Sequence, residues 1–216
     1  MGNIFDIFNE ISAGRAAKSN LPVTHIIVGL GNPGEKYADT RHNAGFRMLE
    51  YLSERCGIRV DSVKFKALVG DGQVGDKRVL LMKPQTYMNL SGEAVVEAAH
   101  FYKIPPENII VFSDDVSLDV GAVRMRRKGS DGGQKGLRSI TTLLGTQEFP
   151  RIKIGVGAKP HKDYDLADWV LGVPSAESKG KIAATFPIIQ ENLSWMLSET
   201  EGDFEKAVQN CNGFRA

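Results

Sequence analysis

Short apolar runs alternate with helical patterns along most of this chain, and the alternation limits the folds open to it. Apolar runs typical of buried strands occupy 23–30, 108–114 and 151–157, and a run of alternating apolar and polar residues occupies 122–128. A hairpin is predicted around Gly75-Asp76, with its two strands at 65–74 and 77–83. Helical patterns occupy 44–57, 91–103, 136–145 and 176–210. We therefore expect an α/β, single-domain, three-layer fold with a twisted, mostly parallel mixed central sheet flanked by helices.

Length and composition limit the class of protein. A chain of 216 residues with a net charge of +1 fits one globular domain and is not a generally basic protein. Its two cysteines, Cys56 and Cys211, lie far apart without metal-ligand spacing, which indicates a reducing compartment. No apolar run approaches the ~20 residues that span a bilayer, and the start lacks the pattern of a secretory signal. We expect a cytoplasmic protein that does not enter membranes.

Residues 1–22 differ from the rest and predict an N-terminal extension, a short amphipathic helix followed by a linker, before a globular domain at 23–216. Apolar side chains recur there at helical spacing, namely Ile4, Phe5, Ile7, Phe8 and Ile11. Such a helix can dock on the body of the protein or bind a membrane surface or a partner. Its polar face carries acids and no lysine, which does not favour anionic lipid.

The segment GLGNPGEKYADTRHNAGF at 29–46 contains the glycine spacing of a dinucleotide-binding loop. Pro33 removes one N–H that a pyrophosphate would need, and eight further residues precede the next helix, which Asn43 is expected to cap. The acid expected at the ribose falls near Glu50, inside that helix. A nicotinamide-dependent enzyme is thus a weak alternative, and we expect the glycines to let the chain turn at the end of a strand.

Polar residues follow several predicted strands. Asn32 follows the first, Asn89 the hairpin and Asp114-Asp115 the next, while GSDGGQKG at 129–136 follows the fourth. In open α/β sheets, ligands bind beyond the carboxyl ends of the strands, so these residues are expected to converge. Asp115 is expected to be a solvated or turn-forming neighbour.

His42 lies at the end of the first loop and is the candidate general base. A neutral imidazole can take a proton from water if a partner such as Asp114 fixes its tautomer. The alternative is a hydrogen bond within its own loop. Asn32 and Asn89 can stabilise an oxyanion or simply form turns. The sequence shows no nucleophile elbow and no metal-ligand pattern. We therefore expect activated water to attack the carbonyl of the substrate directly, without a metal.

A basic stretch at 122–138 carries six cations against one acid, a local charge of +5, whereas 176–205 carries a local −4. This segregation predicts a surface for a polyanion. The alternative is a solvated, charged sheet edge that discourages strand pairing.

Together, the motifs resemble bacterial-type peptidyl-tRNA hydrolases over 23 to the C-terminus. They are GLGNPGEKYADTRHNAGF (29–46), KPQTYMNLSGEAV (83–95), DDVSLDVGAVRMRRKGSDGG (114–133) and FPRIKIGVG (149–157). The resemblance implies hydrolysis of the ester between a peptide and the 3′ end of tRNA, which recycles tRNA for translation. It also implies no cofactor, a peptidyl-tRNA substrate and a monomer.

By motif, the resemblance implies three groups of site residues. The catalytic residues would be His42, Asp114 and Asn32. The substrate-binding residues would be Tyr37, Asn43, Met88, Asn89 and Lys135, and the tRNA phosphate would be held by Arg126 and Lys153.

The sequence departs from the family pattern GGHNG, because Gln134 and Lys135 occupy the histidine and asparagine positions. Lys135 cannot accept a hydrogen bond, so we expect the positioning of water or the turnover to differ from that of the family. A non-catalytic RNA-binding protein on the same fold is the alternative, which the retention of His42, Asp114, Asn32 and Asn89 disfavours.

Overall fold

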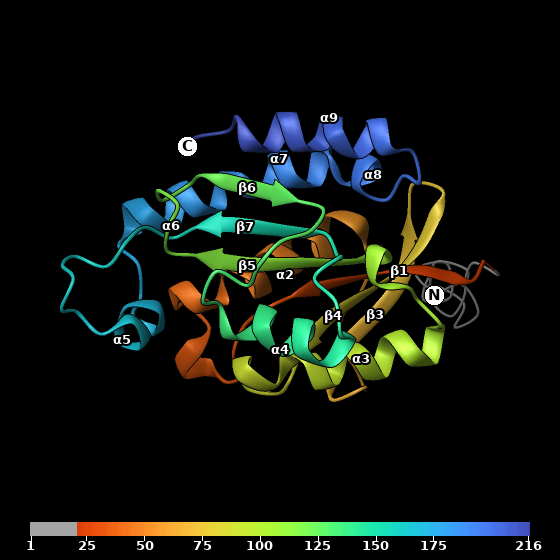
Figure 1. Ribbon diagram of the computed structural model, residues 1–216, viewed down its shortest axis with the longest axis horizontal. Coiled ribbons are helices and arrows are strands. Elements are labelled where there is room, and N and C mark those ends of the chain that lie inside the picture. The colour runs from red at the N-terminus through yellow and green to blue at the C-terminus, as the bar shows by residue number, and fades with distance from the viewer. Residues whose placement is uncertain (1–20) are drawn as a thin grey trace, which may run out of the picture.

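The computed structural model describes residues 21–216, apart from the side chain of Glu201. A seven-stranded sheet runs through the centre of the molecule in the order β2-β3-β4-β1-β5-β7-β6 (Figure 1). Its strands are β1 (Val23–Gly29), β2 (Ser62–Lys64), β3 (Ala67–Val74), β4 (Lys77–Pro84), β5 (Ile109–Asp115), β6 (Val123–Arg126) and β7 (Arg151–Gly155). The helix predicted near the start of the chain lies outside the described residues and stays a prediction.

Four central strands, β4, β1, β5 and β7, run parallel to one another. The edges are antiparallel, where β3 pairs with β4, β2 with β3, and β6 with β7. The carboxyl ends of the central strands therefore meet at one edge of the sheet, at Gly29, Pro84, Asp115 and Gly155. The predicted mixed α/β sheet is confirmed.

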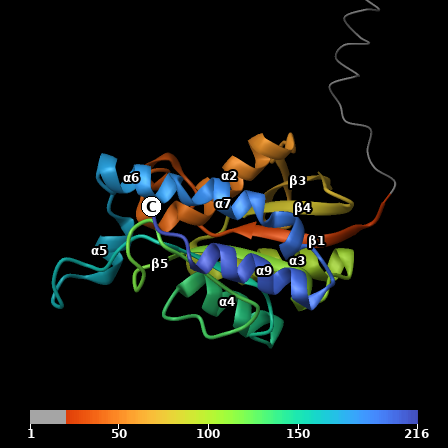
Figure 2. The ribbon, with the colours of Figure 1, turned by 90° about the horizontal axis from the view of Figure 1, so that it is seen from above.

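Helices cover both faces of the sheet. The longer ones are α2 (Ala44–Cys56), α3 (Ser91–Tyr102), α4 (Lys135–Leu144) and α9 (Glu201–Asn212), and the shorter ones α5 (Leu166–Leu171), α6 (Ala176–Ala183), α7 (Thr185–Glu191) and α8 (Leu193–Met196). One hydrophobic core lies between the sheet and α2 with α6 to α9, and the other between the sheet and α3 with α4. Seen from above, α2 and α4 lie on opposite sides of β1 (Figure 2). The three predicted layers are confirmed.

The glycines after β1 serve close packing more than turning. A Cβ on Gly29 would lie 2.4 Å from the carbonyl oxygen of Gly45, and one on Gly31 would lie 2.5 Å from the ring of Phe46. Of the three fingerprint glycines, Gly34 alone has a positive φ, 103°. The expectation of a turn is therefore right for Gly34 and wrong for Gly29 and Gly31, which let α2 approach the end of β1.

The free side of edge strand β6 is covered by the end of α9 and by the C-terminal residues, where Arg215 forms a β-bridge with Ala122. Asn212, the last residue of α9, accepts a hydrogen bond from the backbone N–H of Met125 at 2.6 Å and donates one to its carbonyl at 3.3 Å. The carboxamide thereby bonds the edge strand as a neighbouring strand would.

None of the helices within residues 21–216 is long and apolar enough to cross a membrane.

Candidate active site

His42 and Asp114 meet at the carboxyl edge of the sheet. His42 lies in a single 3-10 turn, Arg41–Asn43, directly before α2, and Asp114 is the penultimate residue of strand β5. The Nδ1 atom of His42 is 2.8 Å from Oδ2 of Asp114, whose side chain is 3% exposed. A carboxylate can only accept, so Nδ1 carries the proton and Nε2 keeps its lone pair. This arrangement suits a general base.

Asn32 is fixed by two neighbouring segments. Its Oδ1 accepts the backbone N–H of Met88 at 2.9 Å, and its own backbone N–H and carbonyl bond the side chain of Asn43 at 2.8 and 3.0 Å. Since Oδ1 faces Met88, the Nδ2 amide group remains as the donor available to a ligand. Asn43 precedes α2 as predicted, but its side chain does not cap the helix, because these two bonds engage it.

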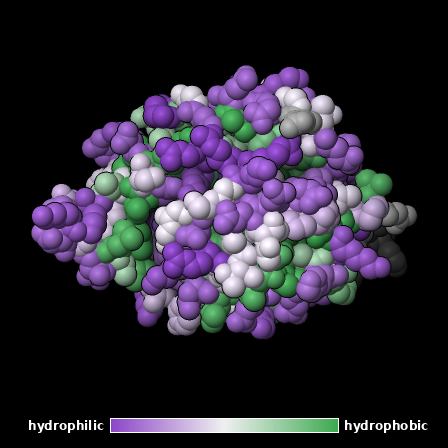
Figure 3. Space-filling model, viewed as in Figure 1, coloured by the Kyte–Doolittle hydropathy of each residue, from purple (hydrophilic) through white to green (hydrophobic). Residues whose placement is uncertain are grey.

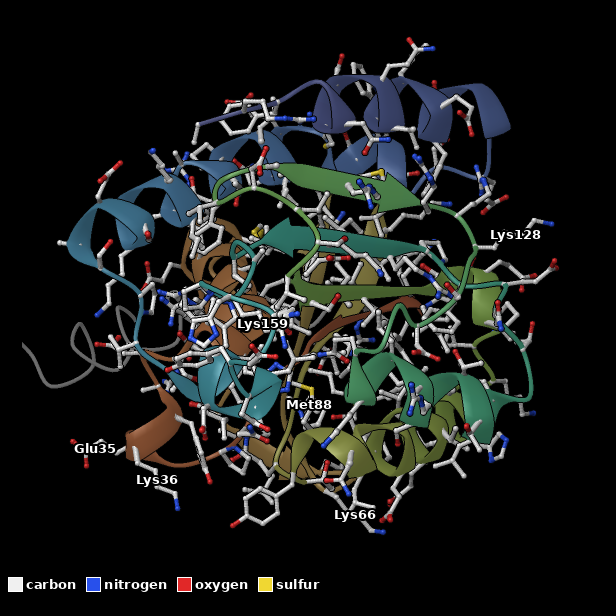
Figure 4. The ribbon with its side chains drawn as sticks, turned by 60° about the vertical axis from the view of Figure 1, so that its left-hand side comes forward. Glu35, Lys36, Lys66, Met88, Lys128 and Lys159 are labelled. Carbon is white, nitrogen blue, oxygen red and sulfur yellow. The ribbon has the colours of Figure 1, made fainter. Side chains whose placement is uncertain are left out.

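A cavity of about 1150 Å³ opens over these residues. His42, Asn32 and Asp114 line its floor together with Met88, Asn89 and Lys135. Figure 4 shows Met88 between α4 and α5, the two helices that form opposite walls. Lys153 lines the cavity as well, so the structure brings together seven of the ten predicted site residues.

The α5 wall is apolar at the surface. Four exposed apolar side chains lie in or beside this helix, namely Tyr164, Leu166, Leu171 and Val173. Figure 3 shows hydrophobic surface gathered at this place. Leu166, Val170 and Leu171 line the cavity with Leu143 of α4, so it combines a polar floor with apolar sides.

Two of the predicted substrate residues do not line this cavity. Tyr37 lies in the 3-10 turn Glu35–Tyr37, half-buried, with the Lys36 ammonium 4.8 Å from its ring centre. Asn43 faces a smaller cavity on the other side of Asn32. The side chain of Asn43 contacts the site through the Asn32 backbone, and the predicted roles of Asn43 and Tyr37 in substrate binding stay predictions.

Lys153 lines the cavity but is already paired. Its ammonium is 3.1 Å from Oδ2 of Asp115, and both side chains are mostly buried. Burial alone would raise the pKa of Asp115, but hydrogen bonds from the Ser117 hydroxyl and N–H, together with Lys153, hold it below its usual range. Asp115 is thus an ion-pair partner as well as the turn former that we predicted.

Arg126 lies outside the cavity, at the end of β6. It is exposed and its guanidinium donates to the neighbouring Met125 carbonyl at 3.1 Å. Arg124 and Lys153 are opposite one another across β6 and β7, and Arg126 lies two residues further along the same face, so these three cations form a cationic face; Arg151, opposite Arg126, is buried.

Two further contacts of the site escaped the sequence patterns. Gln134 donates from Nε2 to Oδ1 of Asp114 at 3.1 Å, so both carboxylate oxygens are engaged. Arg41, next to His42, stacks on the ring of Trp169 at 3.6 Å and donates to its carbonyl at 3.3 Å. This second contact fixes α5 beside the turn that carries His42.

The two cysteine thiols are poor candidates for a nucleophile, and the described residues contain no metal-binding cluster. Burial raises the pKa of the Cys211 thiol to about 12 and that of Cys56 above its usual value, so neither forms a thiolate readily. Within residues 21–216, no group of three or more His, Cys, Asp or Glu side chains could hold a metal ion.

The comparison with known proteins is decisive at this point, because the sequence model of a family described as Peptidyl-tRNA hydrolase matches residues 26–216. The chain belongs to the peptidyl-tRNA hydrolase family. A peptidyl-tRNA hydrolase from Caldicellulosiruptor bescii is 49% identical over 189 residues, covering 88% of this chain and 97% of that protein. Another, from Agathobacter rectalis, is 47% identical and covers 87% of this chain and 100% of that protein.

The crystal structure of the peptidyl-tRNA hydrolase from Acinetobacter baumannii has the same fold. It superposes with a TM-score of 0.83 at 33% identity, over 91% of this chain and 98% of that one. The match to the peptidyl-tRNA hydrolase family starts three residues into β1, so residues 1–25 lie outside it.

Proposed function

We propose that the chain hydrolyses the ester between a peptide, or an N-acyl-aminoacyl group, and the 3′ end of tRNA, with water activated by His42 and Asp114. Family membership supports the substrate. The 2.8 Å bond between His42 and Asp114 on the floor of a large cavity is the observation that carries the mechanism. It favours an enzyme over an RNA-binding protein that has lost catalysis.

The reaction needs three groups from the chain. Nε2 of His42 takes a proton from a water molecule, and the resulting hydroxide adds to the ester carbonyl carbon. Nδ2 of Asn32 donates to the developing oxyanion, and Asn89 lines the same cavity. When the intermediate collapses, the bond to the 3′ oxygen of the ribose breaks, and the imidazolium returns the proton to that oxygen. Asp114 stabilises the imidazolium throughout.

The cavity and the cationic face would bind different parts of the substrate. The apolar walls of α4 and α5 suit peptide side chains, with Lys135, Met88 and Asn89 at the polar floor. Arg126 and Lys153 would hold a phosphate of the tRNA on the adjacent face. Replacing Arg126 by Gln should then reduce the slope of log affinity against log salt by about one, since one phosphate contact is lost. Arg55, exposed near the far end of α2, provides the matched control.

The decisive experiment measures release of N-acetylated amino acid from N-acetyl-aminoacyl-tRNA by the full chain, in the presence of a metal chelator. His42→Ala and Asp114→Asn should each lower kcat by roughly 10²- to 10⁴-fold, because the base or its tautomer is lost. His100→Ala, an exposed histidine on α3, should leave kcat unchanged. Full activity in His42→Ala would refute the mechanism, and tRNA binding without hydrolysis by the wild type would favour the RNA-binding alternative.

We also propose that the protein works as a monomer in the cytoplasm, as expected for an enzyme that meets tRNA there. Analytical ultracentrifugation at micromolar concentration tests the first part, and fractionation of cells the second.

A further inference from the structure

Gln134 connects three parts of the candidate active site. It is 8% exposed and lies at the start of α4, where a long loop from β6 ends. Its Nε2 lies 3.1 Å from Oδ1 of Asp114 and 3.1 Å from the sulfur of Met88, and its Oε1 accepts the backbone N–H of Leu137 at 2.8 Å. The side chain therefore bonds a strand end, the cavity floor and a helix start.

The orientation of the carboxamide follows from these partners. The N–H of Leu137 can only donate, so the amide oxygen must face the helix. The NH₂ group then faces Asp114, which as a carboxylate can only accept. The helix start thus fixes which end of Gln134 meets the carboxylate.

Hydrogen bonds to both carboxylate oxygens restrict the rotation of the Asp114 side chain. The χ2 torsion of an aspartate is broad, so a carboxylate with one partner can rotate. Here Oδ2 bonds His42 and Oδ1 bonds Gln134, which holds the carboxylate plane and with it the imidazole. A neutral donor also draws charge from the carboxylate at every pH, which limits how strongly Asp114 favours the imidazolium.

We propose that Gln134 is a positioning residue that acts through Asp114. Its hydrogen bond fixes the orientation of the Asp114 carboxylate and reduces the preference of that carboxylate for protonated His42, so that the neutral imidazole is available as a base. The effect of Gln134 on catalysis rests on the proposed hydrolysis. Its structural core, the coupling from Gln134 through Asp114 to His42, does not require a substrate.

Other charged groups face the same cavity and must stay constant in the test. Most have an ion-pair partner: Asp115 pairs with Lys153, Asp131 with Arg138, and Glu93 with Lys66, which lies outside the cavity. Lys135 and Asp165 also line it. None of these is altered by a substitution at Gln134.

Two substitutions separate the role toward Asp114 from the role at the helix start. Gln134→Ser keeps a side-chain oxygen that can cap α4, but it is too short to reach Asp114. Gln134→Glu keeps the length and the oxygen for Leu137, but as a carboxylate it presents a negative charge to Asp114. Gln209→Glu, at an exposed position on α9, controls for the change in net charge.

We expect Gln134→Ser to lower kcat about tenfold with little change in KM, a loss typical of removing a partner that orients a reacting group. Gln134→Glu should lower kcat further and move the acidic limb of the kcat/KM profile about one pH unit higher, because a second anion favours the imidazolium. The His42 ring should show the same shift when it is titrated by ¹⁵N NMR without substrate. Gln209→Glu should match the wild type in all three measurements.

An unchanged His42 titration in Gln134→Glu would overturn the proposal, even if kcat fell, because loss of packing alone lowers activity without moving the titration. Wild-type activity in Gln134→Ser would also overturn it. If the wild type failed to hydrolyse N-acetyl-aminoacyl-tRNA but the titration moved as expected, the proposed function would be wrong and the coupling right.

Discussion

The backbone N–H of Met88 donates to Oδ1 of Asn32 at 2.9 Å, across 56 residues of sequence. The bond joins the exit of β1 to the 3-10 turn Met88–Leu90 that follows β4. It also decides which end of the Asn32 amide faces the cavity, and this gives Asn32 two separable roles, one structural and one chemical.

Asn32→Asp should separate these roles. The substituted carboxylate still accepts from Met88, so we expect the melting temperature to change little. It cannot donate to an oxyanion, so kcat should fall by roughly 10²- to 10³-fold. Asn32→Ala should lose both activity and stability, because the Met88 N–H is left without its partner. The pair is measured by steady-state hydrolysis and thermal melting, and an active Asn32→Asp enzyme would rule out the oxyanion role.

Asp115→Asn should strengthen tRNA binding. The ammonium of Lys153 lies 3.1 Å from the Asp115 carboxylate, so a phosphate must compete with that carboxylate for it. Removing the carboxylate charge leaves Lys153 free, and we expect the affinity for deacylated tRNA at low salt to rise severalfold, with a steeper dependence on salt. Asp61→Asn serves as the control, because Asp61 is exposed and lies directly before β2, at the opposite edge of the sheet. Unchanged affinity would mean that Lys153 does not meet the phosphate.

Acid should destabilise the protein through His25. Burial lowers the pKa of His25 to about 4, and Lys77 acts in the same direction. The unfolded chain binds a proton near pH 6.5, so this contribution to stability is complete above pH 6.5 and is lost as the pH falls toward 4. We expect the free energy of unfolding in urea to drop by roughly 2 kcal/mol between pH 7 and pH 5 from this group alone.

The His25→Gln variant should lack that component, and its stability should differ less between the two pH values. His161→Gln, at an exposed loop position, should follow the wild type. Equal pH dependence in His25→Gln and the wild type would contradict the assignment.

Arg151→Met should destabilise the fold strongly. The side chain is 1% exposed, and its guanidinium donates to the carbonyls of Gln147 at 2.7 Å, Ser130 at 3.2 Å and, more closely, Gly129. Burial lowers its pKa to about 10, which still leaves it charged at neutral pH. Methionine fills the space but leaves these carbonyls unbonded, so we expect a loss on the order of 3 kcal/mol in urea unfolding.

The loop that Arg151 holds leads to Gln134, so kcat should fall as well. Arg59→Met, whose side chain is 88% exposed, should change stability by less than about 0.5 kcal/mol. A comparable loss in both variants would show that the buried hydrogen bonds are not responsible.

The periodicity of apolar residues and the positions of the strand ends predict the layers of the fold and the location of the candidate site. The alternation of apolar runs predicted the layers, and the rule that polar groups gather beyond parallel strands predicted that His42 and Asp114 would meet. Both depend on local pattern and on a general property of α/β sheets, so no knowledge of particular contacts was required.

The missed features depend on which distant segments touch. Gln134 reaches Asp114 only because the start of α4 packs beside the end of β5, and Arg41 stacks on Trp169 across 128 residues. Asn43 was predicted as a helix cap from its position, but a tertiary contact with Asn32 uses the same side-chain atoms. The pairing of Lys153 with Asp115 follows from the register of β5 with β7, which sequence spacing does not define.

The carboxamide of Asn212 occupies the outer hydrogen-bonding groups of Met125 on β6. An uncovered strand edge is a template on which another chain can add a strand, so this side chain, together with the β-bridge between Ala122 and Arg215, protects the sheet against growth into aggregates. Asn212 belongs to α9. If heat or proteolysis detached that helix, the edge of β6 would be exposed while the cavity floor with His42 and Asp114 was still folded. Loss of solubility would then precede loss of activity.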